Sequence, residues 1–197
     1  MIPRPHLILF LILTLSWAVN LRADDSKTPR STHMTTILNF DSSPSEPVWY
    51  AVNDGVMGGV SEGGAEIRDG LLHFTGTLSL ENNGGFSSVR TREGSWDFSD
   101  ATEVHLRVKG DGRTYQLRLN TRAEFRNDPI SYGAEFATKS GEWMEVVIPL
   151  AALSPSYRGR TLDGPPFDPT DVQEIGILIG DKTPGPFKLQ VDWIKIQ

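Results

Sequence analysis

The chain contains no cysteine in its 197 residues. This absence excludes disulfide bonds, zinc–thiolate and iron–sulfur centres, thiol catalysis and membrane anchoring through a lipidated cysteine. A hydrophobic core and hydrogen-bonded sheets must therefore stabilise the fold without covalent cross-links.

Catalytic and metal-binding signatures are also missing. The sequence has four histidines, and His33, His73 and His105 do not have the spacing of a metal site. It has no nucleophile elbow, zinc-protease motif, phosphate-binding loop, dinucleotide fingerprint or EF-hand pattern. We therefore predict no catalytic residue, no metal and no cofactor, and interpret the chain as a non-enzymatic binding protein. A loop calcium ion and a hydrolase that uses Asp54 or Glu81 are the remaining alternatives.

The chain has fewer basic than acidic residues. The chain has 19 Lys and Arg against 25 Asp and Glu, which gives a formal net charge of −6. Because nucleic acids and anionic membranes attract basic surfaces, we predict neither as the main partner.

Long hydrophobic runs are confined to the N-terminus. Residues 1–23 combine a basic start, a short apolar run and a small residue, Ala23, ahead of an acidic boundary. This order is typical of a secretory signal peptide, and the run is too short to span a bilayer. We therefore predict an exported protein, periplasmic or extracellular, without a transmembrane helix in the mature chain. An uncleaved anchor is one alternative, and translation from Met34 would instead give a cytoplasmic protein.

The rest of the chain predicts a spacer and one domain. Residues 24–36 are rich in Asp, Ser, Thr, Lys, Pro and Arg, a composition typical of a disordered spacer. Residues 37–197 contain short apolar-alternating runs between Gly, Pro and Asn/Asp clusters, which predicts an antiparallel all-β domain. About nine strands are more than one flat sheet usually holds, so two sheets should face each other as a jelly-roll sandwich.

Two local features refine this prediction. Residues 102–109 and 115–120 alternate on either side of Gly110-Asp111-Gly112, which predicts a tight hairpin. Residues 154–171 are rich in proline and predict a long loop.

The most distinctive segment is residues 49–61, which read WYAVNDGVMGGVS. Asn53-Asp54-Gly55 is a strong turn signal. Gly58-Gly59 removes two side chains where backbone or ligand comes close. We therefore expect at least one of them to have a positive φ, or to lie where an added Cβ would collide with the neighbouring strand that carries Gly84 and Gly85. A second pair, Gly84-Gly85, precedes the strand-like residues 86–90. The two segments together indicate a built site.

On these residues the chain resembles the complex I intermediate-associated protein 30 family, which reads W-x-x-V-N-D-G-V-M-G-G-x-S and carries a G-G-F-x-S-V-R element. The resemblance covers roughly residues 37–197. It implies a galactose-binding-like sandwich. It also implies a chaperone-like protein that binds membrane-arm assembly intermediates of respiratory complex I.

We expect partner or ligand contacts from the two segments and from nearby aromatic and arginine side chains. The candidate residues are Trp49, Asn53, Asp54, Gly58, Gly59, Ser61, Arg90, Arg118 and Arg160. If the three arginines converge with Asn53, they form a polar pocket for a carboxylate, sugar hydroxyls or a partner's backbone. The alternatives are turn closure by Asn53 and Asp54, and solvated charge for Arg118 and Arg160.

Three further expectations concern packing. Met57 is predicted to fill a gap in the core. Arg90 is expected to pair with Asp54 or Glu81. Trp193 is expected to continue the inward face of the last strand.

A second functional hypothesis is a secreted carbohydrate-binding module. The sandwich architecture, the acidic character and the aromatics near the motif, Trp49 and Tyr50, favour it, because aromatic rings stack on sugars. Core packing is the alternative role for Trp49, as it is for Trp96, Trp143 and Trp193.

Overall fold

The computed structural model describes residues 33–41, 47–92 and 94–197. The expected signal segment, residues 1–23, and most of the spacer lie outside these ranges. Thr35 and Thr36 belong to a strand rather than to the spacer, because they pair with Ile196 and Lys195.

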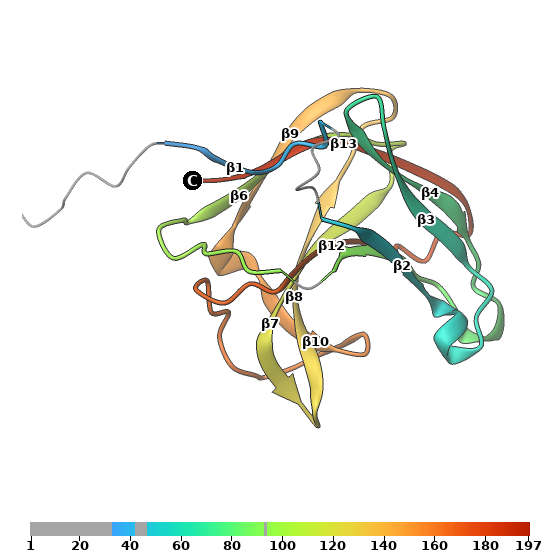
Figure 1. Ribbon diagram of the computed structural model, residues 1–197. Coiled ribbons are helices and arrows are strands. Elements are labelled where there is room, and N and C mark those ends of the chain that lie inside the picture. The colour runs from blue at the N-terminus through green and yellow to red at the C-terminus, as the bar shows by residue number, and fades with distance from the viewer. Residues whose placement is uncertain (1–32, 42–46, 93) are drawn as a thin grey trace, which may run out of the picture. The chain divides into compact units, whose positions relative to one another are not determined.

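Two antiparallel sheets make up the domain (Figure 1), which confirms the predicted all-β sandwich. In the first sheet the strand order is β3 (Glu62–Arg68), β4 (Leu71–Leu78), β13 (Gly185–Ile196), β6 (Glu103–Lys109) and β9 (Trp143–Pro149), and β1 (Thr35–Leu38) pairs with β13. In the second sheet it is β11 (Arg160–Thr161), β10 (Ser154–Tyr157), β8 (Asp128–Ala137), β7 (Thr114–Phe125), β12 (Glu174–Ile179), β5 (Ser87–Thr91) and β2 (Trp49–Asn53).

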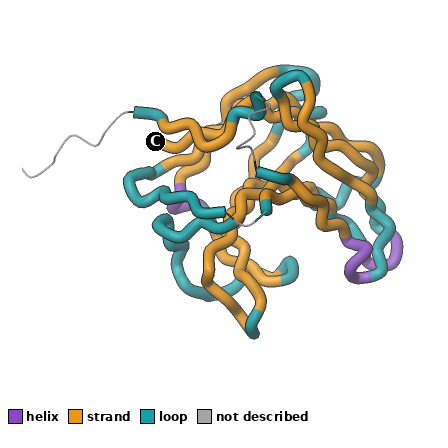
Figure 2. Tube along the Cα trace, in the orientation of Figure 1, coloured by secondary structure: helices purple, strands orange, loops and turns teal. Residues whose placement is uncertain are grey.

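Among the residues that the structure describes, helical structure is limited to short 3-10 turns (Figure 2). These are η1 (Asp54–Met57), η2 (Glu81–Asn83) and η3 (Leu150–Ala152). Within the described ranges, no helix is long and apolar enough to cross a membrane.

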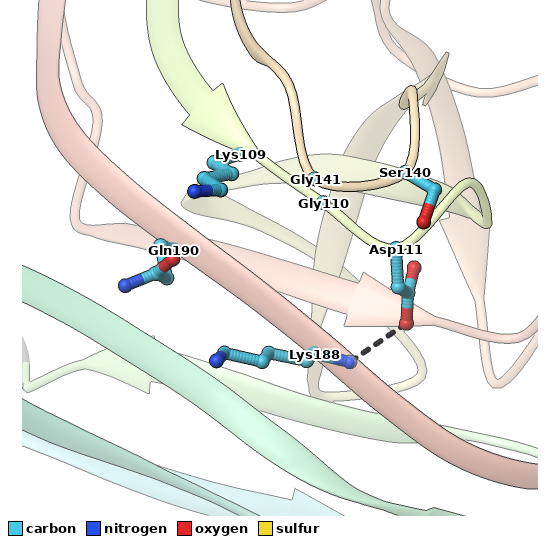
Figure 3. A pocket seen from close by; sticks show the side chains of 7 residues that line it. All are labelled: Lys109, Gly110, Asp111, Ser140, Gly141, Lys188 and Gln190. Carbon is cyan, nitrogen blue, oxygen red and sulfur yellow. Dashed lines mark hydrogen bonds between the residues drawn. The ribbon is translucent and has the colours of Figure 1, made fainter.

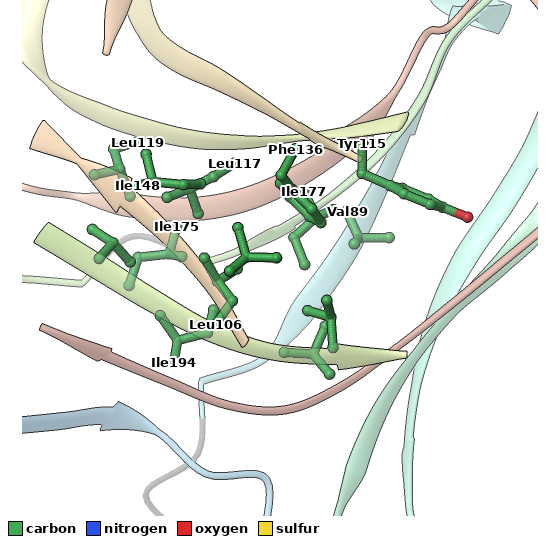
Figure 4. Close-up of a cluster of buried hydrophobic side chains, with 14 of the residues drawn as sticks. Val89, Leu106, Tyr115, Leu117, Leu119, Phe136, Ile148, Ile175, Ile177 and Ile194 are labelled. Carbon is green, nitrogen blue, oxygen red and sulfur yellow. The ribbon is translucent and has the colours of Figure 1, made fainter. Parts of the chain in front are cut away.

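The core lies between the two sheets and consists of the inward residue of each alternating pair. Leu117 and Leu119 of β7 and Ile177 of β12 face Leu106 of β6 and Ile194 of β13 (Figure 4), and all five are fully buried. Burial of apolar area at roughly 25 cal/mol per Å² is the main stabilising contribution in a chain without disulfides.

The expected hairpin at Gly110-Asp111-Gly112 is wrong. The strand before it, β6, pairs with β13 and β9, whereas the strand after it, β7, pairs with β8 and β12. The segment therefore carries the chain from one sheet to the other. Alternation shows which side of each strand is buried, and two strands that face each other across a core alternate in the same way as two neighbours.

Two other expectations are corrected. A register shift between Val191 and Trp193 reverses which face of β13 the following side chains occupy. Ile194 is therefore buried and Trp193 lies outside the core. Nζ of Lys195 is 4.2 Å from the ring centroid of Trp193. Residues 154–171 are not entirely loop, because β10 and β11 form a short hairpin within them.

Candidate functional site

The carboxylate of Asp54 is the centre of the glycine-rich motif. Asp54 begins η1 directly after β2 and is fully buried. Its Oδ1 accepts a hydrogen bond from Ser61 N (2.9 Å), and its Oδ2 accepts from Ser61 Oγ (2.5 Å), Gly85 N (2.6 Å) and Phe86 N (3.3 Å). One side chain therefore joins three segments that are up to 32 residues apart.

These hydrogen bonds determine the charge state of Asp54. Burial alone would raise its pKa, but the donors from Ser61, Gly85 and Phe86 outweigh burial and lower the pKa from its ordinary value of 3.8. Asp54 is therefore an ionised carboxylate at neutral pH, and because it is fully buried and bonded to the protein's own donors, a ligand in solvent cannot reach it.

The paired glycines make room for this carboxylate. A Cβ on Gly59 would lie 2.4 Å from Cγ of Asp54, and a Cβ on Gly84 would lie 2.5 Å from its Oδ2. Gly58 has a φ of +90°, in the left-handed region. The expectation of a positive φ or a steric conflict at Gly58-Gly59 is confirmed, although the conflict is with Asp54 rather than with the strand around Gly84 and Gly85.

Asn53 and Ser61 are also engaged inside the protein. Nδ2 of Asn53 donates to Gly63 O (3.0 Å) in the other sheet, and its Oδ1 accepts from Ser87 Oγ (2.7 Å). Oγ of Ser61 accepts from Ser79 N (2.9 Å) in addition to bonding Asp54. The polar groups of the motif therefore hold the two sheets together at this end of the sandwich.

Three apolar residues of the motif, and Leu80 beside it, are in contrast exposed to solvent. The exposed fractions are 75% for Val56, 59% for Met57, 49% for Val60 and 41% for Leu80. Val60 and Leu80 adjoin the bonded pair Ser61 and Ser79, so the two chain segments lie together around η1 and η2 (Figures 1 and 2). We call Val56, Met57, Val60 and Leu80 the apolar rim.

The expected core position of Met57 is wrong. The chain turns outward through η1 because Asp54, not Met57, occupies the buried position, and the following Gly58 continues the turn. An apolar cluster on a rigid turn is typical of a contact surface for another protein.

A pH prediction follows from the lowered pKa of Asp54. A carboxyl group whose pKa is lower in the folded state stabilises the fold above its unfolded pKa, and this contribution is lost as the pH falls through the folded value. The wild-type protein should therefore exceed Asp54→Asn in unfolding free energy at pH 6. The difference should shrink as the pH is lowered below 3.8. Urea denaturation of both proteins between pH 6 and 2.5 measures it, and a difference that does not change with pH would contradict the assignment.

A second polar surface lies on the outer face of the second sheet. Residues directly paired across antiparallel strands share a face. One such row crosses six strands, in the order Tyr50, Arg90, Gly176, Arg118, Gly133 and Ser154. The two arginines are therefore separated by a glycine, which has no side chain to keep them apart.

Glu174 organises one side of this row. Its Oε1 accepts from Tyr50 Oη (2.6 Å) and its Oε2 from Asn120 Nδ2 (2.6 Å). Arg90 Nη1 is 3.9 Å from Oε2, a distance too long for a hydrogen bond. Burial and the bond to Glu174 raise the pKa of Tyr50 to about 12, so this hydroxyl remains a donor across the physiological range. The expected pairing of Arg90 with Asp54 or Glu81 is wrong.

Arg118 lies largely buried on the same face. Its Nη2 donates to Ser156 Oγ (2.8 Å). Its Nε is buried, and no described residue accepts a hydrogen bond from it. Burial, and then the charge of Arg90, lower the pKa of Arg118 to about 10, so the group is still cationic at neutral pH. The expectation of a solvated charge is wrong for this residue.

The other candidates lie elsewhere. Asn53 faces the interior, opposite Arg90 and Arg118, and Arg160 is exposed on the edge strand β11. Trp49 packs against Phe40 with their ring centroids 6.0 Å apart, which supports its core role. The structure therefore brings together two of the three arginines but not the pocket with Asn53.

Sequence reasoning missed Glu174 and Asn120. Both occupy outward positions next to buried isoleucine and leucine, which alternation could have shown. Their mutual contact depends on the pairing of β7 with β12, and the sequence does not contain that information.

A pocket (Figure 3) is lined by Lys109, Gly110, Asp111, Ser140, Gly141, Lys188 and Gln190. Asp111 accepts from Lys188 N (2.7 Å) and Arg113 N (3.1 Å). Its carboxylate therefore supports the crossover rather than a ligand. In the part of the chain that the structure describes, no group of three or more His, Asp or Glu residues is arranged to hold a metal ion.

Sequence comparison places the chain among known proteins. The model of a family described as complex I intermediate-associated protein 30 matches residues 38–191. The chain belongs to this family. The proteins named "Complex I intermediate-associated protein 30, mitochondrial" from Mus musculus and Drosophila melanogaster illustrate the similarity. The first is 30% identical over 171 residues, 75% of this chain and 51% of the relative. The second is 28% identical over 137 residues, 66% of this chain and 45% of the relative.

The chain thus spans about half the length of the curated relatives it matches. These members of the complex I intermediate-associated protein 30 family are named as mitochondrial proteins, as is one from Neurospora crassa. This naming contradicts the predicted export to the periplasm or extracellular space. That prediction rested on the basic, apolar and small residues of 1–23, and targeting segments for different compartments share such residues.

Solved structures support the fold of this family member. A family 11 carbohydrate-binding module of Clostridium thermocellum has a TM-score of 0.65 at 13% identity and covers 84% of this chain and 95% of that chain. The module from the same organism in complex with a β-1,3-1,4-mixed-linked tetrasaccharide has a TM-score of 0.64 at 13% identity, with 83% and 94% covered. At this identity the likeness shows the fold alone, and it confirms the galactose-binding-like jelly roll.

Proposed function

We propose that the protein is a non-enzymatic assembly factor for respiratory complex I that binds an apolar segment of an assembly intermediate through the apolar rim. The observation that carries this proposal is the division of the motif into two parts. Its polar residues are engaged internally around Asp54, whereas Val56, Met57 and Val60 are exposed, as is Leu80 beside η2. Family membership supports the type of partner, since the relatives are named for an association with complex I intermediates.

The geometry suits contact with another protein. Contact residues that are held rigidly lose little conformational entropy on binding. Val56 and Met57 are held on a turn whose base is tied by the four hydrogen bonds of Asp54. Interfaces between proteins have a largely apolar centre, and the exposed side chains of the apolar rim would supply such a centre.

The test is a double substitution, Val56→Asp with Met57→Asp. Replacing a residue at the centre of an interface costs on the order of 1–2 kcal/mol of binding, so the double variant should capture membrane-arm subunits of complex I more than tenfold less efficiently than wild type. Its melting temperature should not change, because both side chains are exposed in the free protein. Quantitative mass spectrometry of subunits that co-purify with the tagged full-length protein measures the effect.

Val147→Asp is the matched control. Val147 is 48% exposed on β9, in the other sheet from β2, which leads into the rim. This variant should capture the same subunits as wild type. Equal capture by all three proteins would contradict the role of the apolar rim.

A second candidate function is glycan binding on the outer face of the second sheet. The row from Tyr50 to Ser154 favours it, because it offers hydroxyl and guanidinium groups on one face. The carbohydrate-binding modules with the same fold support this candidate.

A further inference from the structure

The two arginines on the outer face of the second sheet are incompletely bonded. Arg90 has one ion pair, to Glu174, at 3.9 Å. Arg118 has one hydrogen bond, to the neutral hydroxyl of Ser156, and no carboxylate within ion-pair distance among the described residues. Removing a charge from water costs several kcal/mol unless a partner compensates it. The structure alone provides Arg118 with no such partner.

The sheet register brings these two side chains to one point. Arg90 and Arg118 both pair with Gly176, from the neighbouring strands β5 and β7 on either side of β12. Neighbouring strands lie about 4.8 Å apart, so the two Cα atoms are about 10 Å apart across the glycine. A Cβ at Gly176 would lie 3.2 Å from Cγ of Arg90, so the glycine is needed for the present position of that side chain.

We propose that Arg90 and Arg118 form a carboxylate-binding site over Gly176, and that its ligand is an acidic sugar, a hexuronate within a glycan. This inference rests on the glycan-binding candidate and names the chemistry of its ligand. Guanidinium groups bind planar oxyanions through two parallel hydrogen bonds. Exposed Glu135 and half-buried Glu174 lie on the same face and would repel a doubly charged phosphate more than a singly charged carboxylate.

The neighbours of the arginines suit the rest of a sugar. Gln116 lies on this face, close to Arg118 and to Gly133. A Cβ added to Gly133 would lie 2.8 Å from Cδ of Gln116. The hydroxyl groups of Ser154 and Ser156 line the next strand, β10. Amide and hydroxyl groups of this kind donate to and accept from sugar hydroxyls. Although burial and then the charge of Arg90 lower the pKa of Arg118 to about 10, the guanidinium is still cationic at neutral pH and can pair with an anionic ligand.

The experiment is isothermal titration of the full chain with trigalacturonate, compared with the neutral β-1,3-1,4-mixed-linked tetrasaccharide, an Asp-rich peptide of equal charge and inorganic phosphate. We expect binding of trigalacturonate, with no detectable binding of the neutral sugar. Arg118→Gln should weaken binding at least tenfold. Arg90→Gln should have the same effect, and it replaces Arg118→Gln in the test if that variant does not fold. Arg107→Gln is the control, because Arg107 lies in the other sheet and pairs with Asp192 at 3.3 Å.

A direct readout comes from the arginine side chains. The guanidinium NMR resonances of Arg90 and Arg118 should shift on addition of trigalacturonate, and that of Arg107 should not. Equal binding of neutral and acidic sugars would overturn the carboxylate site but retain glycan binding. Binding of neither sugar would overturn both the carboxylate site and glycan binding, and it would not affect the proposal that the apolar rim binds a protein partner. Equal or tighter binding of the peptide or of phosphate would overturn the sugar acid as the ligand.

Discussion

Replacing Asp54 with alanine is expected to lower the free energy of unfolding by about 4 kcal/mol, since it removes four hydrogen bonds to a charged acceptor. The donors left behind include the buried backbone N–H groups of Ser61 and Gly85. An unsatisfied buried donor costs the full desolvation penalty of that group. For a domain of this size the melting temperature should fall by about 10 °C. Thermal denaturation followed by circular dichroism measures it.

Asp97→Ala is the control for this prediction. Asp97 also accepts a backbone hydrogen bond, from Ser99 N at 2.9 Å, but it is exposed and links residues two positions apart. Its removal should leave the melting temperature nearly unchanged. If Asp54→Ala melted at the same temperature as Asp97→Ala, the proposed structural role of the motif would be wrong.

Gly59→Ala is expected to destabilise the protein by about 3 kcal/mol, the upper part of the range for overpacking a well-packed site. The added methyl would lie 2.4 Å from Cγ of Asp54, and this carboxylate is held by four hydrogen bonds and has no room to move. Either the turn or the hydrogen bonds must be displaced. Urea denaturation of the variant gives the change in unfolding free energy.

The matched control, Gly55→Ala, lies four residues earlier in the same motif. No atom lies within 4 Å of the position of its added Cβ, and its φ is outside the left-handed region. Alanine there should be neutral or slightly stabilising, because it reduces the entropy of the unfolded chain. Equal destabilisation by the two substitutions would show that the close approach of Gly59 to Asp54 is not the cause.

These predictions separate the two halves of the motif. Variants of the buried half, such as Asp54→Ala, should lose stability first and partner capture only through unfolding. Variants of the exposed half, Val56→Asp with Met57→Asp, should lose capture and keep stability. The motif is therefore interpreted as a device that holds an apolar contact surface at one end of the sandwich.

The sandwich itself could be predicted from the sequence, because alternation directly reports burial. The alternating runs around Leu106 and Leu117 predict half-buried strands, and both runs are strands in the structure. The prediction that these two strands form one hairpin is wrong, because strands on opposite sides of the core show the same alternation of apolar and polar residues as neighbouring strands do. The bulge before Trp193 is likewise invisible in a period-two pattern until the register is known.

The candidate site was predictable only where it is local. Asn53-Asp54-Gly55 and Gly58-Gly59 indicated a constrained turn, and the turn is present. The bond from Gly85 N to Asp54 joins residues 31 apart, and the proximity of Arg90 to Arg118 depends on their shared partner on β12. Such contacts are set by strand register, which a single sequence does not specify.

The most direct test of the account is to measure stability and partner capture on the same preparations of wild type, Asp54→Ala and the double variant Val56→Asp with Met57→Asp. The double variant should have the melting temperature of wild type but capture more than tenfold fewer complex I membrane-arm subunits per folded molecule. Asp54→Ala should melt about 10 °C lower and capture a normal amount per molecule that remains folded. Wild-type capture by the folded double variant would contradict the central claim that the apolar rim binds the partner.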